Sequence, residues 1–218
     1  MDRKLFATVK SLEEIGITEL YLMESRGGKI DKKLLLEELF KKISTESKCV
    51  FYEGSSGYVF GDGNPDSLVV FVGEAPGEEE DRQKKPFVGR AGRYLNEKLQ
   101  EVGLRREDVY ITNVVKSRPP GNRKPTKDEM MGCLPYLRKE IEIIKPKLIV
   151  CLGSTALEGL LGKNLPITRY RGQVFDYPYD RNIKVFLTYH PAYVLRNPQA
   201  DKEFTQDIKK VVELLKEL

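Results

Sequence analysis

Short apolar runs that alternate with helical patterns, from about residue 58 onward, restrict the fold of this chain more than any other feature. The runs span residues 68–72, 109–115, 147–152 and 184–189. They are dense in Val, Ile and Leu, which is typical of strands that helices cover on both faces. Helical patterns lie near residues 89–103, 126–144 and 154–161. This alternation predicts a three-layer α/β/α fold around a central, mostly parallel, four-stranded sheet.

Helix signals refine this outline. Thr126 and Glu129 have the spacing of a capping box, so a helix should begin there, and Pro135 should split or kink it. The chain should close on an amphipathic helix whose apolar face is Phe204, Ile208, Val211, Val212, Leu215 and Leu218. An earlier helical pattern consists of Leu34, Leu35, Leu36, Leu39, Phe40 and Ile43. We therefore expect an N-terminal helical extension over residues 1–48 and an α/β domain over residues 49–218.

The distribution of charges along the chain says more about a phosphate-binding partner than the net charge does. The net charge of +4, from 37 basic and 33 acidic residues, does not by itself indicate nucleic acid. Lys116, Arg118, Arg123 and Lys124 form an acid-free cluster that suits either phosphate binding or a solvated loop. There is no apolar run of membrane-spanning length and no secretion signal, so we expect a cytoplasmic protein that does not engage membranes.

The cysteines favour neither a disulfide framework nor a simple zinc site. There are three, Cys49, Cys133 and Cys151, and none forms a Cys-x-x-Cys pair. Cys151 lies in an apolar run and should belong to the core.

Ligands of parallel sheets bind where the strands end, so the residues that follow each run are candidate site residues. The first run is followed by Gly73, Glu74 and a turn through Gly77 that could pass beside a ligand. The four acids that come next, at 78–81, are explained more simply as an acidic helix start. No Walker-type Gly-Lys-Ser/Thr is present, and the one glycine-rich segment precedes the first run, which counts against an enzyme that binds nucleotide phosphates.

Three further residues have two interpretations each. Phe87 lies in a loop between basic residues, where it could stack on a base or fill the core. Asn113 ends the second run, where its amide could read a base edge or cap a turn. His190, the only histidine, follows the last run and could be catalytic or structural.

Taken together, the strings at these positions resemble family 4, thermophile-type uracil-DNA glycosylases. They are Glu74-Ala75-Pro76-Gly77, Pro86-Phe87-Val88-Gly89, Ile111-Thr112-Asn113, Arg118-Pro119-Pro120 with Asn122-Arg123, Arg171-Gly172 and Tyr189-His190-Pro191-Ala192. Each string is weak alone, but they follow the order and approximate spacing of that family over residues 58–198.

The resemblance implies a DNA repair enzyme that flips uracil out of DNA and hydrolyses its N-glycosidic bond. Phe87 would stack on uracil beside Ala75, Pro76 and Gly77, and Asn113 would bond N3–H and O4 of the base. His190 would stabilise negative charge on O2, and Glu74 would position the attacking water. No lysine matches a Schiff-base role, so the enzyme should be monofunctional and leave an abasic site.

The resemblance also implies contacts with uracil-containing DNA by a monomeric protein. The candidate DNA-binding residues are Arg118, Asn122, Arg123, Arg171 and Arg196, which would hold the backbone, and Leu195, which would wedge into the base stack from the loop after His190.

The chain departs from the family at the positions that usually hold a four-iron, four-sulfur cluster. Two of the four matching positions, Cys49 and Cys133, are cysteines, but the other two are Glu46 and Ser117. Because ligation normally needs four thiolates, we predict no cluster and no other metal, and a local hydrogen bond for Ser117.

Two other functions stay open. One is a non-catalytic DNA-binding relative, against which the joint presence of Glu74, Asn113 and His190 argues. The other is a glycosylase for another deaminated base, since this fold does not fix specificity.

Overall fold

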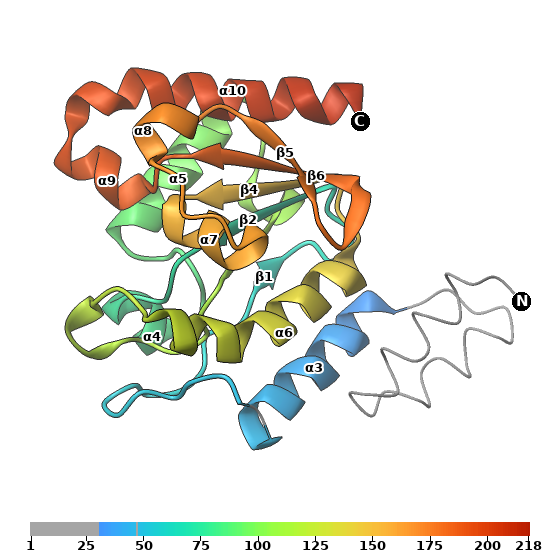
Figure 1. The fold of residues 1–218 in the computed structure, drawn as a ribbon, viewed down its shortest axis with the longest axis vertical. Helices are drawn as coiled ribbons and strands as arrows, with labels where there is room; N and C mark the ends of the chain where they lie inside the picture. Colours follow the sequence, from blue (N-terminus) through green and yellow to red (C-terminus); the bar gives the residue numbers. More distant parts are fainter. Residues whose placement is uncertain (1–30, 47) are drawn as a thin grey trace, which may run out of the picture. The chain divides into compact units, whose positions relative to one another are not determined.

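The computed structural model describes residues 31–46 and 48–218, which fall into two units divided between Ser47 and Lys48 (Figure 1). The described part of the first unit contains the helix α3 (Lys32–Glu46). It begins after Asp31, whose carboxylate accepts hydrogen bonds from the backbone N–H groups of Lys33 and Leu34. The expected apolar face is present except at Leu34, which is 46% exposed. The rest of the predicted extension, residues 1–30 and 47, lies outside the described residues.

The second unit has a sheet of six strands in the order β1-β3-β2-β4-β6-β5. The strands are β1 (Asp62–Gly63), β2 (Val69–Gly73), β3 (Tyr110–Asn113), β4 (Leu148–Leu152), β5 (Val174–Tyr177) and β6 (Asp180–Thr188). The four central strands, β3, β2, β4 and β6, are parallel, as predicted. The predicted number was wrong, because β1 and β5 pair antiparallel at the two edges. The first has only two residues and the second is largely exposed, so neither forms an apolar run.

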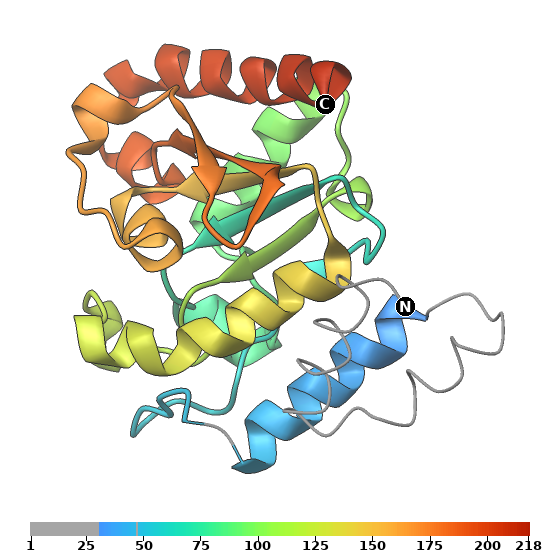
Figure 2. The same cartoon turned by 45° about the vertical axis from the view of Figure 1, so that its right-hand side comes forward.

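Helices cover both faces of the sheet, as Figures 1 and 2 show. One layer consists of α5 (Arg90–Glu101), α9 (Pro191–Arg196) and α10 (Asp201–Glu217), and the other of α6 (Lys127–Ile144) and α7 (Ser154–Leu161). Two short helices, α4 (Glu78–Gln83) and α8 (Ile167–Tyr170), lie in connections. No helix in the described ranges is long and apolar enough to cross a membrane.

Alternate strand residues supply the two cores. Phe71, Ile111 and Val150 belong to the apolar cluster that includes Phe204 and Ile208 of α10. Their sequence neighbours point to the other face, where the Thr112 hydroxyl bonds to a carboxylate of α6. Both faces are therefore buried, which explains why the central strands are continuous apolar runs.

The helix boundaries follow the sequence signals with two corrections. The Thr126 hydroxyl accepts from Glu129 N at 3.3 Å and the Glu129 carboxylate accepts from Thr126 N at 2.6 Å, so the capping box is confirmed. Pro135 lies inside α6, which continues to Ile144, so the helix is not split there; the carbonyl of Met131, which the proline cannot bond, belongs to an exposed residue. Leu218, predicted on the apolar face of α10, is 40% exposed beyond its end.

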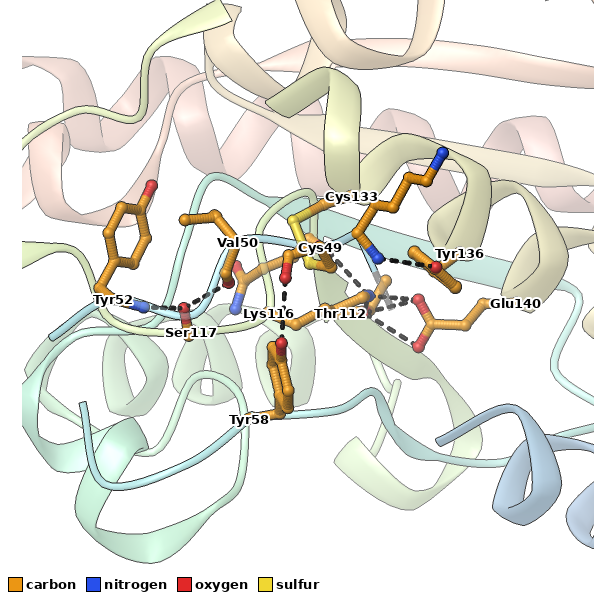
Figure 3. The surroundings of a disulfide bond; sticks show 12 residues. Cys49, Val50, Tyr52, Tyr58, Thr112, Lys116, Ser117, Cys133, Tyr136 and Glu140 are labelled. Atoms are coloured by element: carbon orange, nitrogen blue, oxygen red, sulfur yellow. Dashed lines mark hydrogen bonds and ion pairs between the residues drawn. A yellow bond between two sulfur atoms is a disulfide. The ribbon is translucent and has the colours of Figure 1, made fainter. Parts of the chain in front are cut away.

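A disulfide joins Cys49 to Cys133 and links the segment before β1 to α6 (Figure 3). The expectation against disulfides was therefore wrong for this pair. An odd cysteine count argues only against complete pairing, and 84 residues separate these partners in the sequence. Cys151 is a buried free cysteine of β4, as expected.

We predict that this disulfide stabilises the fold substantially. It closes a loop of 84 residues, and the loss of unfolded-state entropy for such a loop is worth about 4 kcal/mol in the chain-entropy model. A Cys49→Ala/Cys133→Ala variant should lose about that much free energy of unfolding in guanidinium titrations. Dithiothreitol should weaken the wild type and leave the double variant unchanged. Equal unfolding free energies for wild type and variant would show that the bond contributes nothing.

Candidate active site

The carboxyl ends of the four parallel strands open into a pocket of about 510 Å³. Register explains the convergence, since Gly73 of β2 lies opposite Asn113 of β3 and Leu152 of β4 lies opposite Thr188 of β6. The predicted site residues that line this pocket are Glu74, Ala75, Pro76, Gly77, Phe87, Asn113, Asn122, Arg123, His190 and Arg196. Arg118, Arg171 and Leu195 do not line it.

Asn113 presents an unused acceptor to this pocket. It is the last residue of β3, is 2% exposed, and its Oδ1 has no hydrogen-bond partner among the described residues. A buried polar atom without a partner costs about 1–3 kcal/mol, so such an atom in a pocket indicates a ligand that donates to it. Gly73 makes room for this arrangement, because a Cβ there would overlap Asn113 Oδ1 and lie 2.5 Å from the Phe87 ring.

Phe87 is held in an unfavourable backbone conformation at the pocket wall. Its φ of 51° is in the left-handed region, which costs a non-glycine residue free energy. Gly92 permits the conformation, since any Cβ there would collide with the Phe87 carbonyl. The ring is 5% exposed and belongs to the core cluster, and it also lines the pocket. Phe87 therefore fills the core, as one of its two interpretations expected, and it also borders the pocket, while stacking on a base stays a prediction.

Two charged side chains clamp the loop that carries Phe87. Arg106 donates to the carbonyls of Pro86, at 2.6 Å, and Phe87, at 3.1 Å. Glu80 Oε1 accepts from the backbone N–H groups of Val88, at 2.9 Å, and Gly89, at 2.7 Å. Neither role was predicted from the sequence. The acids at 78–81 do begin the helix α4, as expected, but Glu80 also holds the Phe87 loop.

His190 is poised as a neutral hydrogen-bond donor. It precedes α9, and its Nδ1 accepts from Ala192 N at 3.1 Å, which places the single proton of the neutral ring on Nε2. Burial, aided by the positive charge of Arg196, lowers the pKa of His190 from 6.5 to about 4. The ring lies 5.6 Å from that of Phe87 between centroids. Because His190 lines the pocket, its neutral N–H can face a bound ligand at physiological pH.

Glu74 directly follows the last residue of β2, Gly73, which pairs with Asn113 of β3. The strand exits stay paired past the sheet, since Val114 N donates to Gly73 O and Val115 N donates to Glu74 O, both at 3.0 Å. This pairing fixes the backbone of Glu74 while its half-buried side chain lines the pocket.

The predicted DNA-binding arginines fall into two groups, and their roles stay predictions. Arg196 borders the pocket, and its guanidinium forms no hydrogen bond or ion pair with another residue in the described ranges. Arg118 donates from Nε to Asn122 Oδ1 at 2.8 Å and forms a longer ion pair with Glu78, at 3.6 Å.

Two other arginines already have strong partners. Arg123 forms a two-pronged ion pair with Glu129 at 2.6 and 2.9 Å, which lowers the pKa of that carboxyl to about 2. Arg171 bonds to the buried Asp207 at 2.7 Å. Leu195 was expected in a loop but lies in α9, because the helix begins directly after His190.

The sequence analysis also missed the residues that follow β4. Gly153, Ser154 and Thr155 line the pocket, and Gly153 has a φ of 97°. Their position in the sequence could have indicated this, since they directly follow the third apolar run, as the other site residues follow theirs.

The residues at the cluster positions do not fit a four-thiolate iron–sulfur site. Cys49 and Cys133 are bonded to each other. The Ser117 hydroxyl donates to Val50 O at 2.8 Å and accepts from Tyr52 N at 3.3 Å, which confirms the expected local bond. The side chain of Glu46 lies outside the described part of the chain.

Comparison with known proteins gives a consistent match. Residues 60–216 match the family model of the uracil DNA glycosylase superfamily. A type-4 uracil-DNA glycosylase of Archaeoglobus fulgidus is 44% identical over 184 residues, which cover 82% of this chain and 92% of the relative. Another, of Thermotoga maritima, is 45% identical over 185 residues, which cover 84% of this chain and 95% of the relative.

The lowered pKa of His190 can be measured directly, because the chain has a single histidine. We expect its imidazole NMR signals to titrate with a midpoint near pH 4 in the folded protein and near 6.5 in denaturant. Arg196→Gln should raise the midpoint, because a neighbouring cation is removed. A midpoint of 6.5 or above in the folded protein would contradict the neutral-donor assignment.

Proposed function

The chain belongs to the uracil DNA glycosylase superfamily, and we propose that it removes uracil from DNA in base repair. The enzyme is a hydrolase that cleaves the N-glycosidic bond between uracil and deoxyribose and leaves an abasic site. It reaches this bond by flipping the nucleotide out of the duplex into the pocket at the sheet edge.

The observation that carries this proposal is the unpartnered Oδ1 of Asn113. Uracil presents a donor, N3–H, next to an acceptor, O4, so one amide can bond to both. Cytosine presents an acceptor and a donor in the reverse order. Bound there, it would place its N3 lone pair against Oδ1, and each mismatched buried group costs about 1–3 kcal/mol. The amide therefore discriminates between the two bases.

The locked Phe87 loop supports stacking of the flipped base. Its ring has a fixed orientation because the Glu80 and Arg106 clamps hold the backbone on both sides. A preformed stacking wall spares the entropy of ordering a side chain when the base enters.

His190 and Glu74 act on the two charges that separate as the bond breaks. The base leaves with negative charge, to which the Nε2–H of His190 donates at O2, and a donor fixed before reaction stabilises such charge most. The sugar gains positive charge, which the Glu74 carboxylate stabilises while it orients the attacking water. No lysine among the described residues lines the pocket, which supports a monofunctional reaction without a Schiff base.

We also propose that the protein works without an iron–sulfur cluster. At two of the four matching positions, the sulfur atoms form a disulfide. The Ser117 hydroxyl already donates one hydrogen bond and accepts another. Metal analysis of the purified protein should find no stoichiometric iron, and its visible spectrum should be featureless. Iron bound in a cluster-like ratio would contradict this proposal.

The activity can be tested on a labelled DNA strand with a single uracil, cut by alkali after excision. Wild type should cut at uracil and spare a cytosine control strand. Asn113→Ala should lower kcat about 100-fold or more, as loss of a fixed active-site hydrogen bond does elsewhere. Asn182→Ala, the same change at an exposed position near the start of β6, is the matched control and should leave kcat unchanged.

The other candidates give different results in this assay. Binding of DNA without cleavage by wild type would indicate a non-catalytic relative. Cleavage only at another deaminated base would show that Asn113 does not select uracil.

A further inference from the structure

Lys116 and Glu140 form an ion pair with no exposed side-chain surface, and the reaction described above uses neither of them (Figure 3). Glu140 projects from α6 toward the sheet, and Lys116 lies three residues after Asn113. An ion pair of this kind is rarely an efficient stabiliser, because each charge loses its hydration, and apolar residues of similar volume often serve as well. Its presence beneath the base-reading residue needs another explanation.

All three donors of the Lys116 ammonium are used. They go to Thr112 Oγ1 at 2.6 Å, to the backbone carbonyl of Asn113 at 2.9 Å, and to the Glu140 carboxylate. One side chain therefore ties the last two residues of β3 to α6.

Glu140 is itself anchored by several bonds. Its carboxylate accepts from the Tyr110 hydroxyl at 3.2 Å, from the Thr112 hydroxyl and from Gly61 N at 3.3 Å. These donors belong to β3 and to the segment entering β1. Because Glu140 cannot move without breaking them, it holds the ammonium at a fixed point.

The decisive feature is the peptide unit that joins Asn113 to Val114. Its carbonyl accepts from Lys116 and its N–H donates to Gly73 O at 3.0 Å, so both polar ends of one planar group are fixed. Fixing that plane fixes the backbone torsion of Asn113, and with it the direction in which the amide enters the pocket.

We propose that Lys116, held by Glu140, is a positioning residue that sets the orientation of the Asn113 amide and so the fit for uracil. The inference rests on the proposed glycosylase function. Lys116 touches no substrate and acts through the peptide it holds.

The test is a Lys116→Met/Glu140→Gln variant, which removes both charges while Gln keeps polar atoms for Tyr110, Thr112 and Gly61. We expect kcat for uracil excision to fall about tenfold to a hundredfold, since small misplacements of reacting groups have such effects. The inhibition constant of free uracil should rise about tenfold, whereas KM for the DNA should change by less than about twofold, because none of the side chains proposed to hold the DNA backbone is altered.

Two further variants separate positioning from stability. Val211→Ala, in the buried face of α10 on the opposite side of the sheet, should lower the melting temperature and leave the uracil inhibition constant unchanged. Glu140→Gln alone retains the ammonium and should show an intermediate loss of kcat and of uracil affinity. It decides the question if the double variant does not fold.

The inference is overturned if the Lys116 and Glu140 variants melt earlier but keep wild-type kcat and wild-type inhibition by uracil. Failure of the wild type itself to excise uracil would be a different result, which refutes the glycosylase proposal and this inference with it.

Discussion

The pocket depends on how closely β2 and β3 can end beside each other. At that point Gly73 lies opposite Asn113, and the space that any side chain at 73 would fill is occupied by the Asn113 amide and the Phe87 ring. Because Gly73 has no Cβ, the Asn113 amide and the Phe87 ring can lie next to each other. The remaining parts of the site are arranged around this contact, with His190 arriving from β6 and Glu74 continuing from Gly73 itself.

Rigidity is the property that these parts share. The Phe87 loop is clamped by Glu80 and Arg106, His190 is held by Ala192 N, and the peptide after Asn113 is bonded at both ends. Polar groups that are fixed before the substrate arrives need no reorganisation when charge develops, so each contributes more to the transition state than a mobile group would. The unsatisfied Asn113 Oδ1 is a free-energy cost that a ligand donating to it would offset, whereas the unfavourable φ of Phe87 is a cost of holding its ring at the pocket wall.

The sequence predicted the parallel core and ten of the 21 residues that line the pocket, because both depend on local patterns. Buried strands appear as apolar runs, and polar residues after them, such as Asn113 and His190, converge at one edge whatever the details of packing. The edge strands and the Cys49–Cys133 bond were not predictable in this way, since β1 and β5 lack an apolar run and the disulfide joins distant segments. The roles of Glu80, Arg106 and Lys116 were hidden for a similar reason. A charged residue is normally expected on the protein surface, and only the folded structure shows the partners that bury it.

The cross-link between Cys49 and Cys133 also helps to fix the β3 exit. The segment that it anchors bonds to three consecutive residues of the β3 exit: Val59 N donates to Lys116 O at 2.6 Å, Tyr52 N to Ser117 Oγ at 3.3 Å, and Ser55 Oγ accepts from Arg118 N at 3.4 Å. Nothing in the proposed chemistry draws on the sulfur atoms themselves. The covalent bond gives the segment that contacts the β3 exit a fixed connection to α6. The same helix, α6, carries Glu140, which pairs with Lys116. The disulfide, through the segment that it anchors, and the buried ion pair therefore both connect the β3 exit to α6.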